Sequence, residues 1–226
     1  MAFNKTYLRK AAIAAFVILP IVGVLLLSKA VWVHQELPYV GETFVNPDGS
    51  KSYHSVSDIQ LINQHGQKIS LSDFDSSIIV VNIFFATCPE VCPEMNKQVQ
   101  VIAEEFRGNP AVKFLTISID PEHDSVPVIA AYASAYNADL YKRTFATGKK
   151  SVIYDWVFND LLLATEQRGS DFIHDDKIVI IDKKRHIRGI LETRGNSLKE
   201  KLDRVKRIND DINNLLYEYR KQSLDK

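Results

Sequence analysis

The chain has 226 residues, of which 46% are hydrophobic and 25% are charged, a composition typical of globular proteins. Lysine plus arginine equals aspartate plus glutamate at 28 each, so net charge gives no reason to expect nucleic acid or another polyanion as a partner. We therefore predict no nucleic-acid partner, and the function must depend on particular residues.

The chain begins with a segment typical of a membrane anchor. Residues 11–28 carry no charge, and their length just reaches what a helix needs to span a bilayer. Most of the nearby basic residues precede this run, which places residues 1–10 in the cytoplasm and sends the rest across. We expect a single-pass transmembrane anchor over residues 11–29 in an inner membrane, a tether over 30–55, and one domain over 56–226 on the periplasmic side.

A cleaved signal peptide is the alternative reading of the same segment. The small residues after the run, Ser28 and Ala30, enclose Lys29 and make a poor cleavage site. Both readings place the domain outside the cytoplasm, in a compartment that permits disulfides.

Apolar patterns predict the elements of the domain in chain order. Two strands are so uniformly apolar that both of their faces must be buried. The predicted elements are a hairpin over 59–74, strands over 77–86 and 112–119, helices over 93–106 and 126–136, paired strands over 178–182 and 186–192, and an amphipathic helix over 196–219. This order predicts an α/β layered fold, with helices on both faces of a central sheet.

Both cysteines, Cys88 and Cys92, fall between the first buried strand and the helix that follows it. Sites in open α/β sheets form at the carboxyl ends of strands. Each cysteine precedes a proline, which disfavours helical angles at that cysteine. We therefore expect a turn over residues 89–91, with Cys92 as the helix cap and Pro93 at the first helical position. The helix N-terminus is then expected to lower the pKa of both thiols.

Three uses of this cysteine pair fit its spacing. Two extracytoplasmic cysteines commonly form a structural disulfide, although so short a loop gains little from closure entropy. A redox couple is the second use, but the familiar redox motif has two residues between its cysteines and this one has three. The third is a soft-metal site, because two thiolates suit Cu(I) or zinc, with histidine as the expected third ligand.

Two of the six histidines are candidates for that ligand. His123 follows the second buried strand, at the edge of the sheet where the cysteines lie, and His174 lies in the segment that enters a later strand. The residues alone do not choose between them. Met95 carries a soft sulfur three residues after Cys92, but its place on the apolar helix face predicts a core residue.

Three segments in this order, after an N-terminal anchor, resemble the Sco/SenC family. They are FFATCPEVCPEM, ISIDPEHDS and FIHDDKIVIIDKKRHIRG, and the resemblance covers residues 55–189. The family consists of membrane-anchored, thioredoxin-like proteins linked to copper delivery for cytochrome c oxidase. The resemblance implies a thioredoxin-like layered fold with a central mixed sheet.

The resemblance also implies a cofactor and its ligands. Copper, as Cu(I) or Cu(II), would be bound by Cys88, Cys92 and His174. Asp120 and Asp124 of the DPxxD element would lie near the site, although a capped turn explains that element equally well.

The sequence departs from the family pattern at two places. Arg185 stands in a turn where relatives often carry glycine, which affects a hairpin and not the site. Ile173 replaces the aspartate often found just before the histidine, and Asp175 follows the histidine instead. This change leaves open which carboxylate orients the imidazole.

We therefore expect a copper metallochaperone or assembly factor. It would deliver copper to, or prepare, the binuclear copper site of a cytochrome c oxidase subunit, with an upstream copper chaperone or thiol reductant as a second partner. The alternative is an enzyme, a thiol–disulfide oxidoreductase with Cys88 and Cys92 as its redox pair. A peroxidase of the same fold ranks lower, because no arginine lies near Cys88 in sequence, and a purely structural or redox-sensing protein ranks last.

Overall fold

The computed structural model describes residues 15–24, 35–163, 165–168, 171–174 and 176–224, with 165–168 and 171–174 described by their backbone alone. The chain divides into two compact units, Met1–Gln35 and Glu36–Lys226. In the first unit, residues 15–24 are helical. Among the residues described, no helix combines the length and the apolar character needed to cross a membrane. The anchor predicted over 11–29 lies partly outside them.

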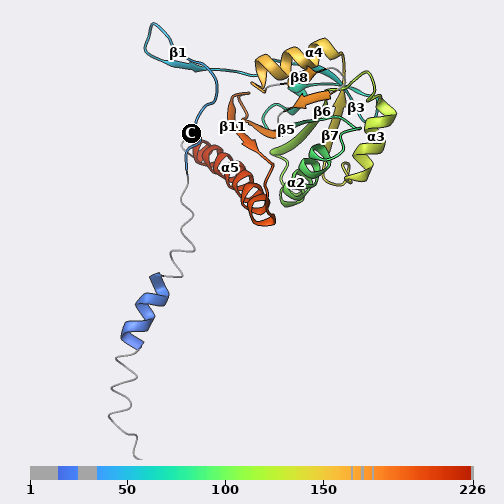
Figure 1. The fold of residues 1–226 in the computed structure, drawn as a ribbon. Helices are drawn as coiled ribbons and strands as arrows, with labels where there is room; N and C mark the ends of the chain where they lie inside the picture. Colours follow the sequence, from blue (N-terminus) through green and yellow to red (C-terminus); the bar gives the residue numbers. More distant parts are fainter. Residues whose placement is uncertain (1–14, 25–34, 164, 169–170, 175, 225–226) are drawn as a thin grey trace, which may run out of the picture. The chain divides into compact units, whose positions relative to one another are not determined.

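A seven-stranded mixed sheet forms the centre of the second unit (Figure 1). Its order is β11-β10-β5-β6-β7-β3-β4, in which β5, β6 and β7 are parallel and the remaining neighbours pair antiparallel. The strands are β3 (Gln60–Asn63), β4 (Lys68–Ser70), β5 (Ile78–Phe84), β6 (Val112–Ser118), β7 (Arg143–Thr147), β10 (Lys177–Ile181) and β11 (Ile187–Glu192). The predicted mixed sheet is confirmed, and β7 is a strand that the sequence patterns did not predict.

Strand β5 is buried along its whole length, as its unbroken apolar run predicts. Ile79, Val81 and Ile83 belong to one hydrophobic cluster, whereas Ile78 and Val80 belong to another. Because successive side chains of a strand point to opposite faces, these two clusters are the two layers of core on either side of the sheet.

The helices cover both faces of the sheet, as predicted. They are η1 (Leu71–Phe74), α2 (Val91–Glu105), α3 (Val126–Ala135), α4 (Lys150–Asp155), the π-helical turn η2 (Trp156–Asp160) and α5 (Leu198–Leu224). Helices α2 and α5 lie side by side (Figure 1) and share a cluster with Ile78 and Val80. Residues of α4 and η2 pack on the opposite face, with Ile79 and Val81.

Helix α5 buries only part of its predicted apolar stripe. Ile208, Ile212 and Leu215 are fully buried against the sheet side of the domain. Leu198 and Leu202, at the start of the helix, are exposed by 73% and 59%. The helix therefore packs on the domain from about Val205 onward.

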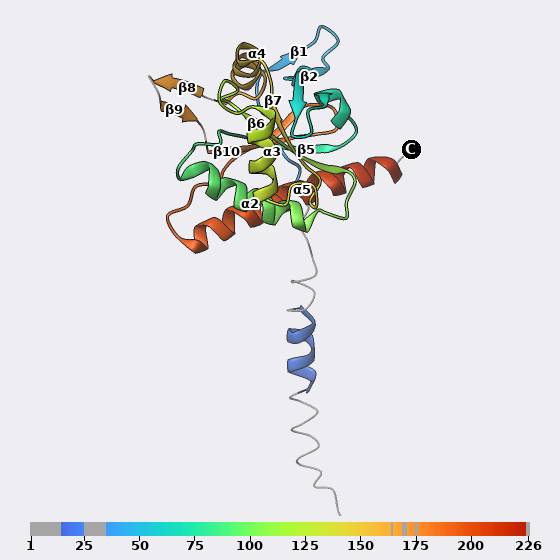
Figure 2. The same cartoon turned by 90° about the vertical axis from the view of Figure 1, so that its right-hand side faces the viewer.

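Two small hairpins lie outside the central sheet. The first joins β1 (Thr43–Val45) to β2 (Lys51–Tyr53), within the segment expected as a tether. The second joins β8 (Thr165–Arg168) to β9 (Asp171–His174), at the periphery of the domain (Figure 2). Neither hairpin was predicted.

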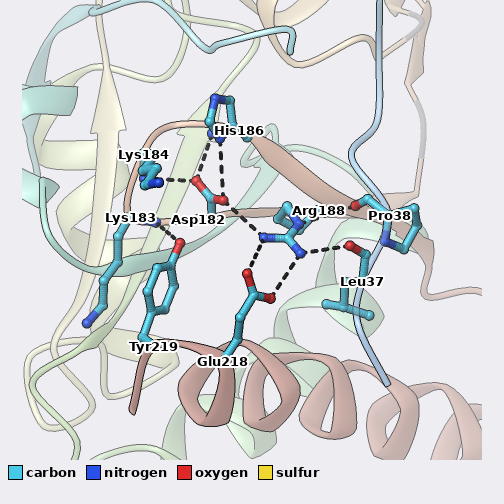
Figure 3. Close-up of polar contacts among 9 residues, drawn as sticks. All are labelled: Leu37, Pro38, Asp182, Lys183, Lys184, His186, Arg188, Glu218 and Tyr219. Carbon is cyan, nitrogen blue, oxygen red and sulfur yellow. Dashed lines mark hydrogen bonds and ion pairs between the residues drawn. The ribbon is translucent and has the colours of Figure 1, made fainter. Parts of the chain in front are cut away.

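A buried ion-pair cluster fixes α5 and the segment just before β1, which we call the lead-in segment and which includes Leu37 and Pro38, to the sheet (Figure 3). The Arg188 guanidinium of β11 contacts the carboxylates of Asp182 and Glu218, at 3.2 and 3.0 Å. It also donates to the backbone oxygens of Leu37, at 2.7 Å, and Pro38, at 3.3 Å. One side chain thus connects the segment before β1, the β10–β11 turn and the last helix.

Candidate metal centre

Cys88 and Cys92 lie where β5 gives way to α2, at the carboxyl edge of the parallel strands. The two side chains are thiols that no disulfide joins, and both are buried, with 7% and 0% of their surface exposed. The backbone N–H of Cys92 donates to the Sγ of Cys88 over 3.2 Å. The turn therefore holds Cys88 against the first turn of the helix that carries Cys92.

The helix starts earlier than the prolines predicted. Helix α2 begins at Val91 with Glu90 as its cap, so Cys92 is already helical and Pro93 is the third helical residue. The prediction of Cys92 as the cap is wrong by two residues. A proline costs no helical hydrogen bond in the first turn, because the N–H groups there have no partner within the helix.

Burial and the neighbouring sulfur of Cys88 set the pKa of the Cys92 thiol. The hydrogen bond with Cys88 and desolvation raise the pKa of Cys92 well above its ordinary value. The prediction that the helix N-terminus lowers this pKa is therefore wrong for Cys92. A metal that binds here must displace a proton that the fold holds firmly.

The DPxxD element braces the loop that leads into the cysteines. Asp124 is fully buried, accepts the backbone N–H of Ala86 over 3.0 Å and accepts the Ser118 hydroxyl over 2.5 Å. Burial raises the pKa of this carboxyl. Its charge also contributes to the raised pKa of Cys92. Asp124 therefore lies within electrostatic reach of the thiol pair.

The His123 imidazole interacts with the neighbouring carboxylate of Asp120. Its Nδ1 lies 2.9 Å from the carboxylate of Asp120, and its side chain is 74% exposed. The hydrogen bond that the His123 imidazole donates to the Asp120 carboxylate raises the pKa of His123. An exposed imidazole that is paired with Asp120 fits a surface residue better than a metal ligand.

His174 ends strand β9, and its backbone pairs with Thr165 of β8. Its side chain lies outside the described residues, as does the whole of Asp175. Among the described side chains, no three of the histidine, cysteine and carboxylate type converge on one point that could hold a metal ion. The described part of the site is thus the cysteine pair.

A layer of buried polar side chains beside the cysteine turn was missed by sequence reasoning. Thr116 of β6 donates to Asn82 of β5 over 2.8 Å, and Asn96 of α2 accepts from Arg143 of β7 over 2.8 Å. Asn96 also donates to the carbonyl oxygen of Cys92 over 3.0 Å. Asn82, an isolated polar residue in the apolar run of β5, was the one sequence signal of this layer.

Comparison with known proteins identifies the family to which these residues belong. The sequence profile of the SCO1/SenC family matches residues 47–209. The human mitochondrial SCO2 homologue is 30% identical over 54% of this chain and 47% of its own length. The chain spans about half the length of this curated relative.

Solved structures share the fold. A structure of BsSco, described as a member of the Sco family of cytochrome c oxidase assembly proteins with a disulfide switch, covers 71% of this chain and 94% of its own, at TM-score 0.59 and 19% identity. Arabidopsis thaliana ScoI with copper bound covers 67% and 96%, at TM-score 0.56 and 17% identity. With a profile match over most of the domain and these shared folds, the chain belongs to the SCO1/SenC family.

Proposed function

We propose that this chain is a copper-binding assembly factor for cytochrome c oxidase. It would bind copper through Cys88, Cys92 and His174, and deliver it to, or prepare, the binuclear copper site of an oxidase subunit. The observation that carries the proposal is the pair of buried thiols that share one turn at the carboxyl edge of the sheet. Membership of the family, whose solved members include one with copper bound, supports the choice of metal.

The chemistry of the donors fits copper as cargo. Thiolate sulfur is a soft ligand that binds Cu(I) tightly, and an incoming pair of thiolates can take the ion over by ligand exchange. Loss of the two thiol protons accompanies binding, so affinity rises with pH. Asp120, Asp124 and Asp175 are the proposed carboxylates around the ligands, and Asp124 already supports the cysteine loop through Ala86.

A copper titration of the reduced full-length protein tests the three-ligand site. One copper per chain is expected, with a thiolate-to-copper charge-transfer band in the Cu(II) form. The band should disappear in Cys88→Ser and Cys92→Ser, and both band and affinity should change in His174→Ala. His123→Ala is the matched control, because His123 faces Asp120. Unchanged binding in His174→Ala would remove that residue from the site.

A second function uses the same pair as a thiol–disulfide oxidoreductase. The contact between Cys92 N–H and Cys88 Sγ favours this alternative, since it holds the two residues close enough for a small movement to join them. Reduction of a model disulfide protein, compared between metal-free and copper-loaded samples, separates the roles. Turnover that is as fast in His174→Ala as in the wild type would favour the oxidoreductase. Copper binding without turnover favours the assembly factor.

Placement in an inner membrane is part of the proposal. The proposed layout is a cytoplasmic segment over 1–10, an anchor over 11–29, a tether over 30–55 and the copper-binding domain over 56–226 on the periplasmic side. The apolar, uncharged run of residues 11–28 supports it. Resistance to carbonate extraction, together with protease access to the domain only from the periplasmic side, is the expected result. Release of the protein into the soluble fraction would contradict an uncleaved anchor.

A further inference from the structure

Arg143 is a buried arginine that has no carboxylate partner among the described side chains. Its side chain is 1% exposed and lies between β7 and helix α2. Its Nη atoms donate to the backbone oxygen of Asn96, to the Asn96 side-chain oxygen and to the Thr116 hydroxyl, at 3.3, 2.8 and 3.4 Å. Its Nε finds no hydrogen-bond partner within the described part of the chain. The hydrogen-bond partners that the structure describes for this cation are therefore all neutral groups.

Such a cation is costly to bury. A charge removed from water needs an opposite charge or full hydrogen bonding to offset its lost hydration. Burial lowers the pKa of Arg143 to about 10, which still leaves the guanidinium charged near neutral pH. A position that serves only packing would more simply hold an apolar side chain. The charge is thus retained in the fold despite its cost.

The cation is coupled to the cysteine turn through Asn96. The Asn96 side-chain oxygen accepts from Arg143, and its amide group donates to the carbonyl oxygen of Cys92. A guanidinium has no acceptor, so Arg143 fixes which end of the Asn96 amide faces Cys92. One short chain of hydrogen bonds therefore joins the cation to the first turn of α2.

Aromatic rings separate the cation and the thiols from water. The guanidinium lies over the rings of Phe145, at 4.9 Å, and Tyr136, at 5.9 Å. Both rings belong to the same hydrophobic cluster as Cys88 and Cys92. Charges that share such an apolar environment interact more strongly than charges in water. The cation and the sulfurs therefore share one weakly screened region.

The oxidation state of the copper sets the net charge of the metal and its two thiolates. Two thiolates and one Cu(I) ion leave one net negative charge, whereas the same two thiolates with a divalent ion are neutral. We propose that Arg143 is the built-in counter-charge of the Cu(I)–dithiolate complex and makes this site prefer Cu(I) over Cu(II). This inference rests on the proposed copper site at Cys88 and Cys92, and it assigns the oxidation state that the site favours.

Removal of the charge tests the inference through the relative affinities for Cu(I) and Cu(II). Full-length wild type and Arg143→Gln are compared by competition with a chelator for each ion. Arg143→Gln should lower the preference for Cu(I) by about tenfold, which corresponds to one unit charge acting over about 12 Å at an effective dielectric of about 20. The potential of the bound copper should fall by about 59 mV, the one-electron equivalent of tenfold. Arg143→Lys keeps the charge, so it should retain most of the Cu(I) preference and most of the copper potential of the wild type.

Two further variants separate charge from folding. Asn96→Asp keeps the shape of the layer and places a carboxylate against Arg143, so it should lower the Cu(I) preference as Arg143→Gln does. Arg188→Gln is the matched control, because that buried arginine already faces two carboxylates. It should leave the Cu(I)/Cu(II) ratio unchanged.

The outcomes distinguish this inference from the proposed function. A wild-type protein that binds neither copper ion overturns both. Normal copper binding with an unchanged Cu(I)/Cu(II) ratio in Arg143→Gln and Asn96→Asp overturns only the counter-charge. An equal loss of both ions in these variants means that Arg143 only shapes the site, and it likewise overturns the counter-charge. A selective loss of Cu(I) that lysine rescues supports it.

Discussion

Two arginines are buried among the described residues of this domain, and their surroundings differ in charge. Arg188 and Arg143 are each 1% exposed. Arg188 faces Asp182 and Glu218 (Figure 3), whereas the described hydrogen-bond partners of Arg143 are the neutral groups of Asn96 and Thr116. Burial acts to lower the pKa of both, but the hydrogen bond with Glu218 raises the pKa of Arg188 above its ordinary value. One charge is neutralised inside the protein and the other is not.

The difference follows the positions of the two arginines. Arg188 joins the lead-in segment to α5, far along the sheet order from β7, and its carboxylates make it a structural centre. Arg143 lies one hydrogen-bonded side chain from Cys92. Natural folds leave local rules unsatisfied mostly at functional sites. The charge of Arg143 therefore lies beside the proposed copper site, whose two thiolates would supply the opposite charge.

The largest expected loss of stability comes from removing Arg188, the buried arginine that is paired with two carboxylates. Arg188→Met leaves Asp182 buried without its cation, so unfolding free energy should fall by about 3–5 kcal/mol. Urea denaturation measures the change. Adding Asp182→Asn and Glu218→Gln to Arg188→Met should recover much of the loss, because no buried charge then remains. A loss below about 1 kcal/mol in the single variant would show that Arg188 is not a structural centre.

Removing Arg143, whose described partners are neutral, should lower the free energy of unfolding by less. Arg143→Met leaves no carboxylate unpaired and deprives only Asn96 and Thr116 of a donor, so the expected loss is about 1–2 kcal/mol. The same denaturation experiment, run on metal-free protein, measures it. If Arg143→Met costs as much as Arg188→Met, the contrast between the two arginines does not hold.

A smaller effect is expected when only one carboxylate of the Arg188 cluster is neutralised. Glu218→Gln keeps the shape of the side chain and leaves Arg188 paired with Asp182, so the loss should be about 1 kcal/mol. A double-mutant cycle of Glu218→Gln with Arg188→Met measures their coupling. Strict additivity would mean that the two side chains act independently.

The smallest effect is expected at a third arginine, on the surface. Arg185 pairs with Asp75 at 2.8 Å, and hydrogen bonds from Arg185 lower the pKa of that carboxyl. Because the folded pKa is depressed, the stabilisation is present above the unfolded value near pH 4 and is lost as pH falls through the folded value. Exposed pairs contribute about 0–1 kcal/mol. Asp75→Asn should remove this small acid-dependent part of the stability curve, with Lys206→Gln as an exposed-pair control.

Arg185 also adopts a backbone conformation that glycine adopts more easily. Its φ of 65° lies in the left-handed region. Arg185→Gly should relieve that strain and lose the ion pair, so the net stability change should be within about 1 kcal/mol.

The local patterns of the sequence were enough for the centre of the fold. The apolar runs of β5 and β6 predicted buried strands, and the stripe of α5 predicted a helix on the sheet. Strand β7 was missed, because its five residues, RTFAT, form neither an unbroken apolar run nor an alternation of polar and apolar side chains. Its place in the sheet comes from pairing with β6 and β3, which no local pattern records.

The site was predictable in position and not in its electrostatics. The junction of strand and helix located Cys88 and Cys92 correctly at the carboxyl edge of the sheet. The pKa of Cys92 could not be predicted, since it depends on contact with Cys88, on burial and on the distant Asp124. Arg143 enters the same region from far along the chain. Long-range contacts of this kind are fixed only by the assembled sheet.

The contact of Arg188 with Leu37 and Pro38 extends the folded domain toward the N-terminus. Because both carbonyl oxygens accept hydrogen bonds from an arginine of β11 that also contacts Glu218 of α5, the segment before β1 is fixed to the sheet and to the last helix. The folded domain therefore begins before its first strand, at about residue 37.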